Sequence, residues 1–342
     1  MKLLVIRLSA FGDVAMTVPV IDSLARQYPQ LDITVLSRPF MAPLFSLMPA
    51  NVHFQGIDLA QNDGPSGLLA LFRQLRGEGF NLVADLHDVL RSKVLRTLFF
   101  LSGVKTAHID KGRRGKKALV RQHGKELVEQ PTSFSRYAAV FARLGYPVKP
   151  AFHSIYGQGK GDASLFASVA VPACGEQWIG VAPFAAHRGK ILPQATVEEL
   201  LRRLTADNRH RVFLFGGGGQ ERAAMEQWAA AYPRVVSLSG KLKLDGELAL
   251  ISHLNVMVSM DSANMHLASL VGVPVVSVWG ATHPFAGFMG WGQSMDNTVQ
   301  LDLPCRPCSI FGNKPCLRGD YACLEGLKAE MIMNKINLIL GV

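Results

Sequence analysis

Short apolar runs alternate with amphipathic stretches along most of the first half of the chain. The apolar runs predict strands at residues 2–8, 32–37, 52–56 and 81–86. Apolar residues at helical spacing predict helices over residues 14–27 and 67–78. Strands that alternate with helices imply right-handed βαβ crossovers, so this half is expected to form a parallel sheet.

A polar, glycine-rich stretch at residues 156–163 interrupts the alternation and predicts a linker. A second series follows, with strands expected at 178–182, 212–215, 235–238, 256–259 and 275–279, and helices at 196–205, 221–230, 244–252 and 264–270. Two consecutive parallel α/β domains predict a cleft at the carboxyl ends of their strands. The alternation ends with a helix expected over residues 327–340.

Length and composition agree with a two-domain globular protein. The chain has 342 residues, of which 49% are hydrophobic and 18% charged. The first residues lack the apolar core and cleavage site of a signal peptide, and nowhere do eighteen uncharged apolar residues follow one another. We therefore expect a cytoplasmic protein that is soluble or peripheral to a membrane.

Positive charge is concentrated in one part of the chain. Residues 91–125 contain 11 Lys and Arg residues and a single acid, Asp110, whereas the formal net charge of the whole chain is +10. Such a segment attracts a polyanion, which could be a nucleic acid, an acidic membrane or a phosphorylated glycolipid, unless it is only a solvated loop. No nucleic-acid-binding motif accompanies it, so nucleic acid is the weaker candidate.

The segment from Val256 to Gly280 carries the clearest candidate chemistry. A strand is expected to end at Asp261 and Ser262, after which a helix begins at once. The unpaired N–H groups of that helix start would bind a diphosphate, although Asp261 and Ser262 would equally serve as simple caps. His266 lies one turn into the helix and would, by itself, be more typical of a structural residue.

Four short motifs follow one another along the chain. They are R-x-S-x-x-G-D at residues 7–13, K-x-x-P at 190–193, a glycine-rich loop before Glu221, and D-S-x-x-x-H-x-A at 261–268 with G-x-T-x-P at 280–284. In this order they resemble the signatures of glycosyltransferase family 9, the heptosyltransferases. The resemblance spans nearly the whole chain.

The resemblance implies a GT-B fold, with two Rossmann-like domains whose parallel sheets face a cleft. We expect an acceptor-binding domain at residues 1–158, a nucleotide-sugar-binding domain at 164–324, and a terminal helix within 325–342 that packs back on the N-terminal domain. The implied enzyme is an inverting, metal-independent glycosyltransferase. It would move a heptose or related sugar from ADP-heptose to the inner core of lipopolysaccharide or a similar anionic glycolipid, in peripheral contact with the inner membrane.

The resemblance also assigns roles to single residues. Asp13 would be the base, since a carboxylate is ionised at neutral pH and can accept the proton of the acceptor hydroxyl. Positive charge on Lys190 and the helix start would stabilise the leaving diphosphate. The implied donor contacts are Lys190, Glu221 at the ribose, Leu242 at the base, Asp261, Ser262, Ala263 and His266. Bidentate pairing makes Arg113, Arg114 and Arg121 the candidates for binding the anionic acceptor.

The loop before Lys190 departs from the family pattern. It reads Phe-Ala-Ala-His-Arg at residues 184–188, where well-known members have hydroxyl residues, and Leu192 replaces the usual tryptophan. His187 or Arg188 could compensate. The departure concerns the identity of the donor more than the type of reaction.

Four cysteines lie close together near the C-terminus, as Cys305, Cys308, Cys316 and Cys323. In a cytosolic chain this spacing fits either a structural zinc or iron-type site or packed free thiols.

Four other functions are alternatives to the heptosyltransferase. A family member with a different nucleotide sugar would keep every motif. A GT-B nucleotide-sugar epimerase would not explain the basic segment, and a non-catalytic binder would not require Asp13. A nicotinamide oxidoreductase would require G-x-G-x-x-G after a strand, which neither first loop contains.

Overall fold

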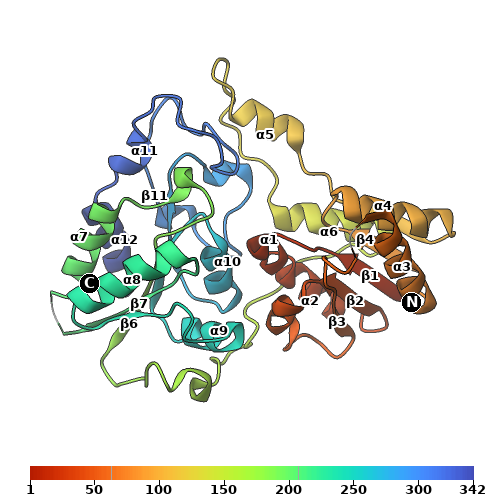
Figure 1. Ribbon diagram of the computed structural model, residues 1–342, viewed down its shortest axis with the longest axis horizontal. Helices are drawn as coiled ribbons and strands as arrows, with labels where there is room; N and C mark the ends of the chain where they lie inside the picture. The colour runs from red at the N-terminus through yellow and green to blue at the C-terminus, as the bar shows by residue number, and fades with distance from the viewer. Residues whose placement is uncertain (63, 207) are drawn as a thin grey trace. The chain divides into compact units, whose positions relative to one another are not determined.

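Two parallel sheets, each flanked by helices, organise the computed structural model, which describes residues 1–62, 64–206 and 208–342 (Figure 1). Residues 1–111 and 132–155 form the first unit, and residues 112–131 and 156–342 form the second. The predicted pair of α/β domains is confirmed. No helix within the described ranges is long and apolar enough to span a membrane.

The first unit is built on a sheet with the strand order β3-β2-β1-β4-β5. Its strands are β1 (Lys2–Ile6), β2 (Asp32–Ser37), β3 (Val52–Gly56), β4 (Leu82–Asp85) and β5 (Lys105–His108). Its helices are α1 (Phe11–Ala15), α2 (Val18–Gln27), the 3₁₀ turn η1 (Pro39–Phe45), α3 (Gly64–Gly77), α4 (Leu90–Leu101) and α6 (Ser133–Leu144). Apolar residues of α3 and α4 pack with those of β1 and β4 in one buried cluster.

The second unit has a sheet with the strand order β11-β10-β9-β6-β7-β8. Its strands are β6 (Gln177–Ala182), β7 (His210–Leu214), β8 (Val235–Ser237), β9 (Val256–Met260), β10 (Val275–Trp279) and β11 (Thr298–Gln300). Its helices are α5 (Arg113–Leu119), α7 (Gln194–Leu204), α8 (Gly219–Ala231), α9 (Leu244–Ser252), α10 (Ala263–Leu270), α11 (Ala322–Glu325) and α12 (Ala329–Leu340). Its 3₁₀ turns are η2 (Ala163–Phe166), η3 (Arg188–Lys190), η4 (Pro284–Ala286) and η5 (Met295–Asn297).

Strand register brings the loops of each unit to one sheet edge. In the first unit, Ile6 at the end of β1 pairs with Leu36 of β2 and Asp85 of β4. In the second unit, the end of β9 lies between β6 and β10, because Ser259 pairs with both Ala182 and Ser277. Residues that follow these strands are therefore neighbours at the carboxyl edge.

Three expectations about the chain's organisation differ from the structure. The stretch at 112–131 belongs to the second unit, not to the N-terminal domain. The terminal helix α12 also belongs to the second unit, since Ile332 and Ile336 are buried in its core with residues of α7 and β9. The helix expected over 14–27 is two helices, because Pro19 is the second residue of α2 and has no backbone N–H to donate to the preceding turn.

Candidate functional site

Asp13 lies in the first turn of α1, directly after the loop that follows β1. Its Oδ2 is 2.7 Å from Arg7 Nη2 and accepts a hydrogen bond of 3.4 Å from the Ala10 amide. The side chain is 33% exposed. Within the described residues nothing donates a hydrogen bond to Oδ1, so one carboxylate oxygen is held and the other is open to a ligand.

Arg7 is fixed from several sides and in turn orients Asp13. The residue is 7% exposed, and its Nη1 donates a 2.6 Å hydrogen bond to the Leu86 carbonyl. The Tyr137 ring lies beside the guanidinium at 6.0 Å, and the Tyr137 hydroxyl donates to the Asp13 carbonyl at 3.3 Å. Arg7 is part of the N-terminal motif, but the motif gave it no role of its own. Tyr137 lies on α6 and could not have been assigned from local sequence.

His87 adds a neutral ring to this edge. Its Nδ1 accepts a 3.4 Å hydrogen bond from the Leu8 amide, and its Nε2 lies 3.3 Å from Ser9 Oγ. Because an amide N–H can only donate, Nδ1 is unprotonated in this arrangement and Nε2 carries the hydrogen. Burial, aided by the positive charges of Arg7 and Lys111, lowers the pKa of His87 to about 4. The ring is therefore neutral at pH 7.

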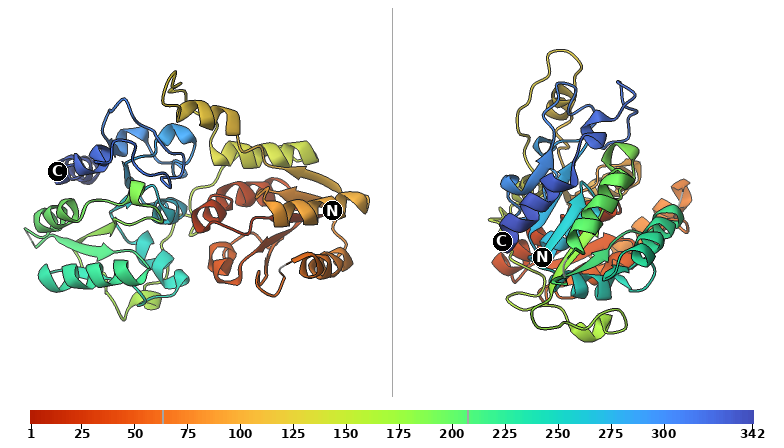
Figure 2. Two further views of the ribbon diagram at one scale, coloured as in Figure 1. Left: turned by 45° about the horizontal axis from the view of Figure 1, so that its top comes forward. Right: turned by 90° about the vertical axis from the view of Figure 1, so that its left-hand side faces the viewer.

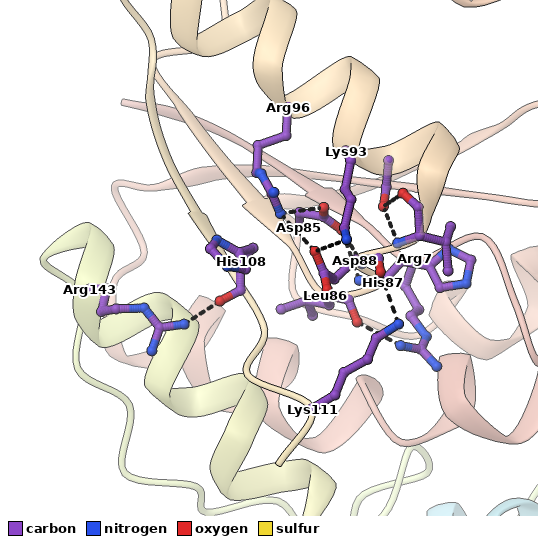
Figure 3. Close-up of polar contacts among 12 residues, drawn as sticks. Arg7, Asp85, Leu86, His87, Asp88, Lys93, Arg96, His108, Lys111 and Arg143 are labelled. Atoms are coloured by element: carbon purple, nitrogen blue, oxygen red, sulfur yellow. Dashed lines mark hydrogen bonds and ion pairs between the residues drawn. The ribbon is translucent and has the colours of Figure 1, made fainter. Parts of the chain in front are cut away.

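Behind this edge, the buried carboxylate of Asp85 organises the loop after β4 (Figure 3). Asp85 Oδ1 accepts hydrogen bonds from the amides of His87 and Asp88, at 2.9 and 2.8 Å. Its Oδ2 is 2.9 Å from Arg96 Nη1, and Lys111 Nζ donates to the Asp88 carbonyl at 3.0 Å. The loop that carries His87 is thus held by charge-assisted bonds.

The second unit brings Lys190 and Asp261, which belong to two different motifs, close together. Lys190 Nζ is 3.5 Å from Asp261 Oδ2, and the two side chains are only 14% and 7% exposed. Ser262 occupies the N-cap position of α10 but its side chain makes no cap hydrogen bond there; its Oγ lies 3.3 Å from Ser259 Oγ instead. The first N–H groups of α10 therefore lack a side-chain cap from Ser262, which suits the binding of an anion.

Three loops pack closely around Lys190. The Ala281 amide donates to the Gly189 carbonyl at 2.8 Å, and the Ala281 carbonyl accepts from the Cys308 amide at 3.1 Å. Gly312, with φ +74°, lies against the lysine stem, since a Cβ built on it would be 2.5 Å from Lys190 Cγ. A glycine from the cysteine-rich loop thus shapes the space of the lysine, a relation that sequence reasoning missed.

The other predicted donor residues differ in their contacts and in how far they are buried. Glu221 Oε2 accepts hydrogen bonds from the Gly217 and Gly218 amides, at 2.9 and 3.3 Å, so this oxygen caps its own helix α8. Leu242 is half-buried in the turn before α9, and Ala263 begins α10. His266 is buried on α10, with 7% exposure.

The atypical loop before Lys190 has structural partners. Leu192 is 3% exposed and belongs to the core of the second unit, so it replaces a larger side chain at a packed position. Arg188 pairs with Glu325 at 2.9 Å and lies 4.9 Å from the Tyr321 ring centroid. The arginine is thus engaged by two residues of the C-terminal region.

The predicted acceptor arginines lie on the surface of the second unit. Arg113 and Arg114 are exposed on α5, and Arg121 forms a 3.0 Å ion pair with the exposed Glu126. The structure groups them with the donor residues in one unit, whereas Asp13 belongs to the other.

The four clustered cysteines are free thiols. Burial raises the pKa of Cys308, as do the neighbouring thiols of Cys305 and Cys316, and burial raises the pKa of Cys323 to about 11. Among the residues that the structure describes, no three His, Cys, Asp or Glu side chains are arranged to hold a metal ion.

Comparison with known proteins agrees with the sequence motifs. Residues 68–314 match the family model for glycosyltransferase family 9 (heptosyltransferase). The chain is 26% identical to lipopolysaccharide heptosyltransferase 3 of Escherichia coli over 85% of each chain, and 25% identical to lipopolysaccharide heptosyltransferase 1 of Pseudomonas aeruginosa over 90% of this chain and 86% of that protein. A solved structure of Escherichia coli heptosyltransferase WaaC with ADP-2-deoxy-2-fluoro heptose superposes with a TM-score of 0.70, at 20% identity and 99% coverage of both chains.

Proposed function

Because the chain belongs to glycosyltransferase family 9, the heptosyltransferases, and has the GT-B fold of its structural neighbours, we propose that it transfers a heptose from ADP-heptose to a lipopolysaccharide core. The acceptor is the inner core of lipopolysaccharide or a similar anionic glycolipid. Relatives that match over most of the chain are lipopolysaccharide heptosyltransferases, which supports this assignment.

The proposal rests chiefly on Lys190 and Asp261 at the start of α10. A cation and uncapped backbone N–H groups at one point form a binding site for a diphosphate. We assign the diphosphate of the donor to Lys190 and to the start of α10 at Ser262 and Ala263. Asp261 then accepts hydrogen bonds from the sugar end of the donor.

We assign Asp13 as the base of a direct displacement. Its carboxylate takes the proton of the acceptor hydroxyl while that oxygen forms a bond to the anomeric carbon of the donor. The bond from this carbon to the diphosphate breaks, ADP leaves with the electron pair, and the anomeric configuration inverts. Asp13 Oδ1 is the accepting atom, because Arg7 and the Ala10 amide occupy Oδ2.

No metal takes part in the proposed reaction. Lys190 and the dipole of α10, both in the second unit, stabilise the negative charge that develops on the leaving diphosphate. We assign Glu221 Oε1 to the ribose of the donor and the turn at Leu242 to its base, and we assign the buried His266 to the support of the helix.

We further propose that the acceptor's carboxylates and phosphates bind Arg113, Arg114 and Arg121. The acceptor is lipid-linked, so the enzyme would work on the cytoplasmic face of the inner membrane as a peripheral protein. The exposure of Arg113 and Arg114 supports this role, since both guanidinium groups can reach a large ligand.

A family transferase with another nucleotide sugar is the second candidate. It is favoured by the loop at residues 184–188, where small and basic residues replace hydroxyl groups, and by the engagement of Arg188 with Glu325. Chemistry at Asp13 would be the same.

The test is the thermal unfolding midpoint with ADP-heptose and with other ADP-, UDP- and GDP-sugars. A ligand at a hundred times its dissociation constant adds about 2.7 kcal/mol to native stability. A selective rise with ADP-heptose is expected, and K190M should lose it while K243M, at an exposed position before α9, keeps it. A rise with another nucleotide sugar alone would overturn the donor assignment, and an unchanged response of K190M would overturn the diphosphate site.

A further inference from the structure

Two segments far apart in sequence project from the same end of the second unit (Figures 1 and 2). One is the segment at residues 112–131, with α5, and the other is the cysteine-rich loop at residues 304–319. Lys116 Nζ lies 4.1 Å from the centroid of the Phe288 ring, which is itself 5.8 Å from the Phe311 ring. Lys125 Nζ donates a 3.2 Å hydrogen bond to the Pro304 carbonyl. We call these two segments together the loop face.

The loop face carries positive charge that the protein does not neutralise. Residues 112–131 contain six Lys and Arg residues against two acids, and residues 304–319 contain three against none. Two of these cations are paired, Arg121 with Glu126 and Arg318 with Asp320. Four exposed cations make no hydrogen bond or ion pair within the described part of the chain: Arg113, Arg114, Lys117 and Lys314.

Large apolar side chains are exposed on both segments of the loop face. Leu127 and Val128 are 52% and 61% exposed, and Phe311 and Leu317 are 55% and 64% exposed. A single exposed apolar residue is ordinary on a protein surface. Here two such pairs occur on adjoining, projecting segments among unpaired cations, which is the composition of surfaces that lie in a membrane interface.

We propose that the loop face docks the enzyme on an anionic phospholipid bilayer. Leu127, Val128, Phe311 and Leu317 enter the headgroup region, where their apolar surface leaves water. Of the unpaired cations, Lys117 and Lys314 face the lipid phosphates, and each contributes about fivefold to the affinity. The inference rests on the proposed function, because a lipid-linked acceptor is presented in such a bilayer.

A bilayer explains the loop face better than the acceptor glycan alone does. Anionic sugars would account for the arginines, but they offer no partner for four apolar side chains. A bilayer accounts for both, since its phosphates attract the cations and its acyl boundary takes up the apolar groups. A nucleic acid would instead require aromatic stacking platforms, and Phe311 is the sole exposed aromatic residue within the loop face as the structure describes it.

Vesicle co-sedimentation without any acceptor tests the docking directly. We expect the wild-type protein to bind vesicles of phosphatidylcholine and phosphatidylglycerol, to release them at high salt, and to bind phosphatidylcholine vesicles weakly. The variants L127S/V128S, F311S/L317S and K117S/K314S should each bind at least about tenfold more weakly. L338S, which removes an equally exposed apolar residue on α12, should bind as the wild type does.

The proposal would be overturned if the wild type did not bind the anionic vesicles, or if the three loop-face variants bound them as tightly as the wild type does. These residues are all exposed, so unchanged unfolding midpoints should accompany the altered binding.

Transfer assays separate this inference from the proposed function. With a deacylated, water-soluble acceptor, the two apolar double variants should transfer sugar at the wild-type rate. With the acylated acceptor in anionic vesicles they should be at least tenfold slower. If the double variants and the wild type transfer at equal rates in both formats, the docking role is overturned. If the wild type transfers no sugar in either format, the proposed function is contradicted, and vesicle co-sedimentation alone decides whether the loop face binds a bilayer.

Discussion

The carboxyl edges of the two sheets are built by different means. At the edge after β1, Asp13 is held by a buried arginine, which is itself held by a backbone carbonyl and an aromatic ring. At the edge after β9, the Lys190–Asp261 pair stands beside a helix start without a side-chain cap and beside loops in which Gly189 and Gly312 pack tightly. Charged side chains fix the first edge, while close backbone packing shapes the second.

The difference fits the roles that we propose for the two edges in sugar transfer. A base must present one oxygen in a fixed direction, and a network that engages the other oxygen does this. A diphosphate needs donors that are not already satisfied, which an uncapped helix start and a single lysine supply. The comparison predicts that changes at the first edge affect turnover, whereas changes at the second affect donor affinity.

The largest expected effect comes from D13N at the first edge. The amide keeps the size of the side chain but cannot take up a proton, so kcat should fall about 10²- to 10⁴-fold. Donor binding, measured as the rise in unfolding midpoint with ADP-heptose, should stay as in the wild type. Steady-state transfer to a soluble acceptor measures the first quantity and thermal unfolding the second.

D22N is the matched control for this change. Asp22 lies on α2 in the same unit and pairs with Arg26 at 2.8 Å, whereas Asp13 pairs with Arg7. It should lose little activity. Transfer by D13N at the wild-type rate would show that Asp13 is not the base, and loss of the donor response in D13N would contradict the division of roles between the edges.

A smaller effect is expected from G312A at the second edge. The new methyl group would lie 2.5 Å from Lys190 Cγ and 3.1 Å from Cδ, so the lysine must move away from its place beside Asp261. We expect KM for the donor to rise about tenfold, equivalent to about 1.4 kcal/mol, with a smaller change in kcat. Initial rates at varied donor concentration measure both.

G319A controls for backbone strain in the same loop. Gly312 and Gly319 have φ values of +74° and +79°, so alanine is strained at both, but a Cβ on Gly319 meets nothing within 4 Å. Backbone strain affects KM in both variants, so only G312A should raise KM further. Equal values of KM in the two variants would mean that Gly312 does not position Lys190.

Sequence periodicity predicted most of the fold because the strands are buried and the helices are amphipathic. Strands β2, β3 and β10 and helix α9 have the predicted bounds. The assignment of α5 and α12 to the second unit could not be predicted, since it depends on tertiary contacts such as Lys125 with Pro304 and Ile336 in the core. A basic, surface-exposed stretch has no apolar pattern that would identify its partner.

The candidate site could be predicted where residues of the motifs contact one another, and less well where other residues contribute. Lys190 and Asp261 were both assigned to the donor from their motifs, and their side chains are 3.5 Å apart. The contacts of Arg7 with Tyr137 and of Gly312 with Lys190 join residues more than 100 positions apart, and no local pattern encodes such pairs. Glu221 was predicted at the ribose, and one of its oxygens caps α8. This capping role could have been predicted, because Glu221 is the third residue of the helix.

The smallest expected effects concern pH, to which His87 of the first unit and Glu247 of the second respond in opposite directions. His87 of the first unit has a folded pKa of about 4, below its usual 6.5, so the unfolded state binds more protons between these values and stability falls as the pH drops through them. Burial raises the pKa of Glu247, on α9 of the second unit, from 4.5 to about 7. Here the folded state binds more protons, and stability falls as the pH rises from about 4.5 to 7.

E247Q isolates the second of these responses. Glutamine stays neutral at every pH, so the variant should lose the decline in stability toward pH 7 and gain on the order of 1 kcal/mol at pH 7.5 relative to pH 5, about 2–4 °C in unfolding midpoint. H87Q should instead flatten the decline below pH 6.5 and leave the neutral side unchanged, although His283 of the second unit, whose pKa burial lowers to about 4, retains part of the acid decline. Midpoints measured from pH 4 to 8 compare the three proteins. If E247Q follows the wild-type curve throughout, the Glu247 carboxyl is hydrated in the folded protein, and the contrast between the units would rest on the two sheet edges alone.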